Sequence, residues 1–164
     1  MKKPLLVLAT LVVAACATSP KTETAPPANE TKPVAAAPAA ETESSKLAGE
    51  IQALQKQSVY FDFDKSVVKP AYNEVIHNQA RFIKAHKNDI VTVEGNCDER
   101  GSSEYNLALG SRRAKAVAKS LEIDGAPAAQ IKVLSYGEEK PRLLCHEEKC
   151  WKENRRADFV HKLD

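Results

Sequence analysis

A low-complexity stretch at residues 17–45 restricts where this chain can fold. It has no aromatic residue and carries prolines that disfavour helices and strands: Pro20, Pro26, Pro27, Pro33 and Pro38. We expect a semi-extended tether that continues to residue 57. A short helix at 45–57 is possible, because Leu47, Ile51 and Leu54 have helical spacing. The folded domain should therefore occupy residues 58–164.

The N-terminus predicts export and lipidation. Two lysines, an apolar run at 5–13 and two alanines precede Cys16, and the run is too short to span a bilayer as a stable helix. Residues 12–16 resemble a bacterial lipobox, in which the cysteine is acylated and residues 1–15 are a signal peptide. By the same resemblance, Ala17 directs the lipoprotein to the outer membrane, facing the periplasm. An ordinary signal peptide is the alternative.

The charge composition argues against nucleic acid as a partner. The chain has 24 Lys and Arg residues against 22 Asp and Glu residues, which gives a net charge of +2 and no clustered basic face. The four histidines do not belong to a nucleophile motif: His77, His86, His146 and His161. We therefore expect no enzyme, no catalytic residue and no cofactor.

Strand and helix patterns alternate along the C-terminal part of the chain. Residues with period-two spacing or high β-propensity predict strands at 59–63, 90–94, 131–136 and 157–162. Apolar residues at helical spacing predict helices at 70–86 and 104–123. This order, βαβα followed by two strands, predicts the α/β class, with helices packed on a sheet.

An arginine interrupts the apolar stripe of the second predicted helix. Positions four residues apart form this stripe: Tyr105, Leu109, Arg113, Val117 and Leu121. A charge that faces a core is costly unless it is paired. Arg112 is rotated away by about 100° and can remain in solvent. The pattern predicts an anionic partner for Arg113 and none for Arg112.

Two aspartates follow predicted strands. Asp64 comes after the first strand and Asp98 after the second. If these strands are parallel, both side chains emerge at one edge of the sheet, where ligands of open α/β sheets bind. A carboxylate on Asp98 and a guanidinium on Arg113 would fit a zwitterion, with its ammonium on Asp98 and its carboxylate on Arg113. A purely structural Asp98–Arg113 salt bridge explains the pattern equally well.

Several separated motifs resemble the peptidoglycan-binding domain of the OmpA-like family. They lie, in chain order, at 59–64, 98–101, 105–109, 112–117 and 154–157, and the likeness covers residues 58–164. The resemblance implies a βαβαββ domain, an α+β sandwich with one mixed sheet. It also implies noncovalent binding of peptidoglycan through the diaminopimelate of the stem peptide.

The resemblance further assigns site residues and partners. It implies that Asp98 and Arg113 make the paired charge contacts with peptidoglycan, and that further positions contribute to the pocket: Phe63, Asp64, Arg100 and Leu109. With the lipobox and the tether, it implies a link between outer membrane and wall that works with TolB and other Tol proteins in envelope integrity and cell division. A periplasmic protein–protein module that acts mainly through a Tol partner is the alternative.

The three cysteines after the tether have separate expected roles. Cys145 and Cys150 are expected to form a disulfide in an oxidising compartment. Cys97 is expected to be a small buried residue, and the irregular spacing of the three cysteines disfavours zinc.

Three positions depart from the pattern of the OmpA-like family. Asn96 and Cys97 replace the family's His and Thr. Gly110 replaces a Ser and costs about 0.8–1 kcal/mol of helix propensity against Ala.

Overall fold

The computed structural model describes the backbone of residues 38–163 and the side chains of residues 42–163. The elements are α1 (Pro38–Gln55), β1 (Ser58–Tyr60), the 3-10 helix η1 (Pro70–Tyr72), α2 (Asn73–Ala85), β2 (Asp89–Asn96), α3 (Ser103–Ile123), η2 (Ala128–Gln130), β3 (Ile131–Gly137), α4 (Glu148–Asn154) and β4 (Arg156–Leu163). The predicted signal peptide, Cys16 and most of the tether lie outside the described residues. Among the described helices, none combines the length and the apolar composition needed to cross a membrane.

One four-stranded mixed sheet organises the domain. Its order is β1-β4-β2-β3, with β4 antiparallel to both of its neighbours and β2 parallel to β3. Strands β1 and β2 therefore run in the same direction, and the segments that follow them begin at the same end of the sheet. The predicted α/β class and mixed sheet are confirmed.

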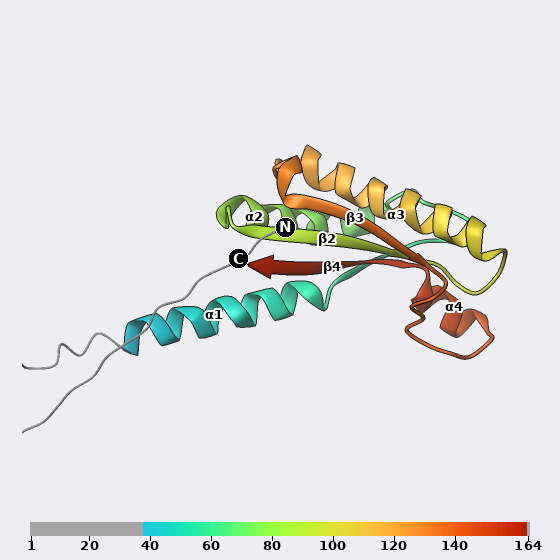
Figure 1. Ribbon diagram of the computed structural model, residues 1–164, viewed down its shortest axis with the longest axis horizontal. Helices are drawn as coiled ribbons and strands as arrows, with labels where there is room; N and C mark the ends of the chain where they lie inside the picture. Colours follow the sequence, from blue (N-terminus) through green and yellow to red (C-terminus); the bar gives the residue numbers. More distant parts are fainter. Residues whose placement is uncertain (1–37, 164) are drawn as a thin grey trace, which may run out of the picture. The chain divides into compact units, whose positions relative to one another are not determined.

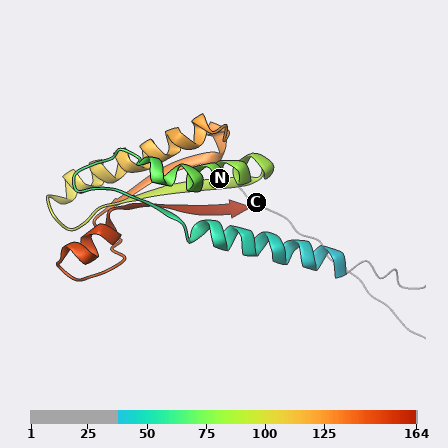
Figure 2. The same cartoon turned by 180° about the vertical axis from the view of Figure 1, so that it is seen from behind.

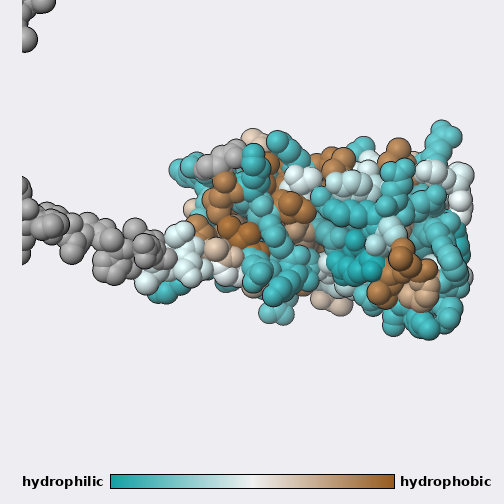
Figure 3. Space-filling view, turned by 60° about the horizontal axis from the view of Figure 1, so that its bottom comes forward, coloured by the Kyte–Doolittle hydropathy of each residue, from teal (hydrophilic) through white to brown (hydrophobic). Residues whose placement is uncertain are grey.

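The core lies between the sheet and helices α2 and α3, which cover one of its faces (Figures 1 and 2). Buried residues alternate with partly exposed ones over residues 89–93 of β2 and 157–162 of β4, as period-two spacing requires, whereas the last four residues of β2 are all buried. The buried apolar cluster contains Val59, Phe61, Ile76, Ala80, Ile83, Val91, Val93, Ala114, Val117, Leu121, Ala126, Ala157 and Phe159. Exposed apolar side chains outside this cluster include the neighbours Val133 and Leu134 and the neighbours Leu143 and Leu144, and the apolar areas on the face in Figure 3 are separated by hydrophilic surface.

Two glycines allow α3 to approach β2 closely. A Cβ atom on Gly95 would overlap the carbonyl group of Gly110, and a Cβ on Gly110 would overlap Ser135 Oγ and come within 2.8 Å of the Gly95 carbonyl oxygen. The absence of both side chains is therefore a packing requirement. It brings Arg113, one turn further along α3, next to the end of β2.

Three elements differ from the predictions. Residues 38–44, assigned to the tether, form the first part of α1, because Pro38 stands at the first helical position, where its missing N–H is tolerated. The last turn of α1 is anchored by Gln79 Nε2, which donates to the Leu54 carbonyl at 2.9 Å. Strand β1 ends at Tyr60 instead of residue 63, since a turn follows it. Helix α4 was not predicted; its seven residues are too few to show periodicity.

Candidate functional site

A cavity of about 240 Å³ lies beyond the ends of β1 and β2, beside the first turns of α3. All six residues assigned from the sequence line it: Phe63, Asp64, Asp98, Arg100, Leu109 and Arg113. Cys97, Gly101, Tyr105 and Asn106 complete the lining. The expected meeting of the two strand ends with α3 is thus observed. The roles of these residues in binding remain predictions.

Arg113 is fully buried, and carbonyl oxygens surround its guanidinium. Nε donates to the Lys65 carbonyl at 2.8 Å, Nη1 to the Asn96 carbonyl at 2.8 Å, and Nη2 to the Asp62 carbonyl at 3.2 Å. Nη1 also contacts Cys97 Sγ at 3.3 Å. Among the described residues, no carboxylate forms a salt bridge with Arg113; carbonyl dipoles from the turn after β1 and from the end of β2 stabilise the charge instead. Burial lowers the pKa of Arg113 from its ordinary value, and the nearby Cys97 and Asp98 oppose this shift.

The turn after β1 supplies two of these carbonyls. Asp64 has a φ of 55°, in the left-handed region that Asp tolerates better than most residues. This turn also places the carboxylate of Asp64 next to the hydroxyl of Tyr105, which donates a short hydrogen bond to it. Tyr105 is accordingly part of the cavity rim and partly exposed, instead of facing the core as its helical spacing suggested.

Asp98 is buried and pairs with two other arginines. Its Oδ2 accepts hydrogen bonds from Arg100 Nη2 at 2.7 Å and from Arg155 Nη1 at 3.1 Å. Its Oδ1 accepts the backbone N–H and the Nε–H of Arg100 at 3.1 and 3.2 Å. Burial alone would raise the pKa of Asp98, but these bonds outweigh it and hold the pKa below its usual value. The direct Asp98–Arg113 salt bridge considered from the sequence is not formed.

Arg100 stacks on two aromatic rings at the cavity mouth. Its Cζ atom lies 4.1 Å from the ring centroid of Phe63 and 4.1 Å from that of Trp151. Glu148 Oε2 lies 3.6 Å from its Nη2. Two rings and two carboxylates therefore fix a half-exposed guanidinium beside Asp98.

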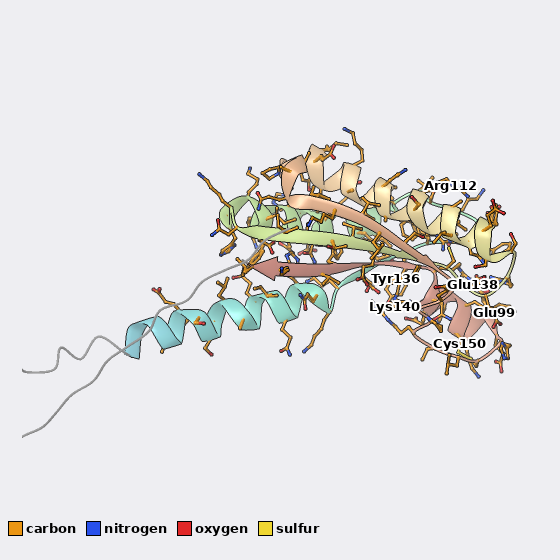
Figure 4. All side chains as sticks on the ribbon, in the orientation of Figure 1. Glu99, Arg112, Tyr136, Glu138, Lys140 and Cys150 are labelled. Atoms are coloured by element: carbon orange, nitrogen blue, oxygen red, sulfur yellow. A yellow bond between two sulfur atoms is a disulfide. The ribbon has the colours of Figure 1, made fainter. Side chains whose placement is uncertain are left out.

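Helix α4, which the sequence did not predict, supports the loop beside the cavity through contacts with Arg100 and Glu99. Trp151 Nε1 donates to Glu99 Oε1 at 2.8 Å, and Glu99 also contacts His146 Nδ1 at 2.7 Å. Figure 4 shows Glu99 and Cys150 at the same end of the molecule, around α4. Arg155, the second partner of Asp98, follows α4 directly. Its place in the 154–157 motif is the sequence signal that could have identified it.

The predicted disulfide and the predicted burial of Cys97 are confirmed. Cys145 and Cys150 form a disulfide with a Cα–Cα distance of 5.7 Å. Cys97 is buried, donates to the Asn106 carbonyl at 3.2 Å, and has its pKa raised to about 11 by burial. A thiol with this pKa is protonated and unreactive at neutral pH. Within the described residues, no group of three or more His, Cys, Asp or Glu side chains is arranged for a metal ion.

Comparison with known proteins places the chain in a family. Residues 60–155 match the OmpA family. The chain belongs to the OmpA family. It is also related to the peptidoglycan-associated lipoproteins: it is 45% identical to that of Pasteurella multocida over 113 residues, 68% of this chain and 75% of the relative. The Agrobacterium fabrum protein of the same name is 43% identical over 102 residues, 62% of this chain and 58% of the relative.

Solved structures of OmpA-like domains have the same fold. The peptidoglycan-associated lipoprotein of Burkholderia pseudomallei superposes with a TM-score of 0.64 and 47% identity, over 65% of this chain and 91% of that one. The C-terminal domain of Helicobacter pylori MotB superposes with a TM-score of 0.61 over 66% of this chain and 85% of that one. At 21% identity, the second likeness concerns the fold alone.

Proposed function

We propose that this protein is a lipid-anchored protein of the outer membrane that binds peptidoglycan noncovalently and so links the membrane to the cell wall. The observation that carries the proposal is the cavity in which the buried carboxylate of Asp98 lies beside the guanidinium groups of Arg100 and Arg113. Opposite fixed charges in one cavity suit a zwitterionic group. The relatives named for peptidoglycan association support the same class of ligand.

The ligand group would be the diaminopimelate of the stem peptide. Its ammonium would bind Asp98, which is ionised at neutral pH because its pKa is low. Its carboxylate would lie toward the positive charges of Arg100 and Arg113. Phe63, Asp64 and Leu109 would contact the aliphatic chain and the cavity rim. This role is recognition without covalent chemistry, so we propose no catalytic step.

The N-terminal segment would provide the anchor and the reach. Acyl chains on Cys16 would hold the protein in the outer membrane on the periplasmic side, since several chains anchor more stably than one. Residues 17–37 could span at most about 75 Å when fully extended, at ~3.3–3.6 Å per residue. We further propose that TolB and other Tol proteins are partners in envelope integrity and cell division. The family resemblance supports this part.

A sedimentation assay with purified sacculi tests the proposal. The full mature chain should pellet with sacculi, and an excess of free meso-diaminopimelate should release it. Asp98→Asn, which keeps the shape but removes the charge, should remain in the supernatant. Arg81→Gln, on the exposed surface of α2, should pellet like wild type.

Two further results decide between interpretations. A urea titration of each variant shows whether the fold is kept, because Asp98 also holds Arg155. A folded Asp98→Asn protein that still pellets with sacculi would contradict the proposal. If the same variant also still binds a Tol protein, that result would favour the alternative of a protein–protein module.

A further inference from the structure

The carboxylate of Asp98 already has its complement of hydrogen-bond donors. Oδ1 accepts two bonds from Arg100, and Oδ2 accepts one from Arg100 and one from Arg155. An ionised carboxylate has about four lone-pair sites. An ammonium that binds Asp98 therefore has to replace one of these donors.

The guanidinium of Arg100 is the donor placed to be replaced. The side chain of Arg155 is only 6% exposed, and its Nε donates to the Phe61 carbonyl at 3.1 Å while Nη2 pairs with Glu148. The backbone N–H of Arg100 is fixed by the turn that contains it. In contrast, the Arg100 side chain is 32% exposed and lines the cavity.

Two rings hold the guanidinium of Arg100 at the cavity independently of Asp98. Phe63 and Trp151 both lie within cation–π distance of it. When an ammonium takes its place on Asp98, the guanidinium can stay in this stack and turn its N–H groups toward a carboxylate of the same ligand. Its Nη1 takes no part in the bonds to Asp98.

Trp151 depends on a crosslinked loop for its position. It belongs to α4, which has seven residues and no side-chain hydrogen bond at its N-cap, Glu147. Helices of this length are unstable alone in water. The disulfide between Cys145 and Cys150, the residue before Trp151, closes the preceding loop, and Glu99 accepts the indole N–H.

We propose that Arg100 is the specificity-determining residue of this site and that Trp151, braced by the Cys145–Cys150 disulfide, is its positioning residue. Arg100 exchanges Asp98 for a carboxylate of the ligand, so the site selects amino acids over amines. An amine without a carboxylate displaces Arg100 from Asp98 but supplies no new acceptor for the N–H groups of Arg100. The exchange rests on the proposed function, because it takes diaminopimelate as the ligand group.

Calorimetric titration of the full mature chain with two probes tests the exchange. The probes are meso-diaminopimelate and pentane-1,5-diamine, which has the same carbon chain between its amines and no carboxylate. Wild type should prefer diaminopimelate. Arg100→Gln should reduce this preference by about ten- to a hundredfold, the loss expected for one charge-assisted pair. Arg81→Gln should leave the preference unchanged.

The positioning roles of Trp151 and of the disulfide are tested with variants that remove the ring, keep a ring, or remove the crosslink. Trp151→Leu should reduce the preference in the same direction as Arg100→Gln, whereas Trp151→Phe should restore most of it, because a ring still supports Arg100. The double substitution Cys145→Ser with Cys150→Ser should resemble Trp151→Leu. A merely structural role for Trp151 would lower the melting temperature without changing the ratio of the two affinities.

The outcomes separate this proposal from the proposed function. Binding of diaminopimelate that is lost in Asp98→Asn but equally selective in Arg100→Gln would overturn the exchange and leave the proposed function standing. Equal selectivity of the Leu and Phe variants at position 151 would overturn the role of Trp151. A wild-type chain that binds neither sacculi nor diaminopimelate contradicts both.

Discussion

At the residue scale, a buried guanidinium organises the site without a carboxylate partner. Arg113 has no exposed surface and donates to the carbonyls of Asp62, Lys65 and Asn96. Its planar fork of five N–H groups suits this arrangement, whereas Lys has three donors on one atom. Arg113 therefore joins the turn after β1 to the end of β2. It shapes the cavity and contributes positive charge to it.

The stability of the folded state should depend strongly on this side chain. Arg113→Ala removes the donors of three carbonyl oxygens and leaves a cavity in the place of the side chain. We therefore expect the free energy of unfolding to fall by at least about 3 kcal/mol. Urea denaturation measures it. Arg112→Ala, one residue away and exposed, should change stability by about 0.5 kcal/mol or less. Equal effects of the two variants would contradict the assignment.

At the element scale, the approach of α3 to β2 shapes the cavity, and α4 with its disulfide-closed loop supports Arg100 at its edge. The Gly95–Gly110 contact places α3 so close to β2 that Arg113 reaches the carbonyl of Asn96, the last residue of the strand. Helix α4 places the ring of Trp151 against the guanidinium of Arg100. The strands and long helices were predictable because their periodicity is local. Helix α4 was not, because a short helix has no periodic signal and is held by contacts with distant residues.

Gly110 gives an element-scale prediction in which local and tertiary effects have opposite signs. Gly110→Ala gains about 0.8–1 kcal/mol of helix propensity. Its Cβ would, however, overlap Ser135 Oγ and approach the Gly95 carbonyl, so we expect net destabilisation. Gly49→Ala in α1, where nothing lies within 4 Å of the added atom, is the matched control and should be neutral or stabilising. Thermal unfolding of both variants checks this, and a stabilised Gly110→Ala protein would contradict it.

At the scale of the whole molecule, stability should decrease in acid through the Asp98 cluster. The folded pKa of Asp98 lies below its ordinary value, because the hydrogen bonds from Arg100 and Arg155 outweigh the effect of burial. Its contribution to stability is therefore present above the unfolded pKa, about 3.9, and is lost as the pH falls through the folded pKa.

Urea titrations of wild type and Asp98→Asn at several pH values measure this contribution. The stability advantage of wild type should be constant near neutral pH and should shrink below about pH 4, where the unfolded chain begins to bind the proton. Acidic groups far from Asp98 titrate alike in both proteins and cancel in the difference, whereas Asp98 raises the pKa of Glu99 and Glu148, which therefore belong to the measured cluster. An advantage that is independent of pH down to pH 2 would show that the charge of Asp98 does not stabilise the fold.

The sequence by itself determined the fold class, the positions of the four strands and the two long helices, and six of the residues that line the cavity. It could do so because hydrophobic periodicity, turn residues and short motifs are local properties of the chain. The tertiary structure alone decided which charges pair: Asp98 with Arg100 and Arg155, and Arg113 with carbonyl oxygens. Helical spacing shows that a buried arginine needs acceptors. The spacing does not show which acceptors, because loops from separate strands meet only when the sheet has formed.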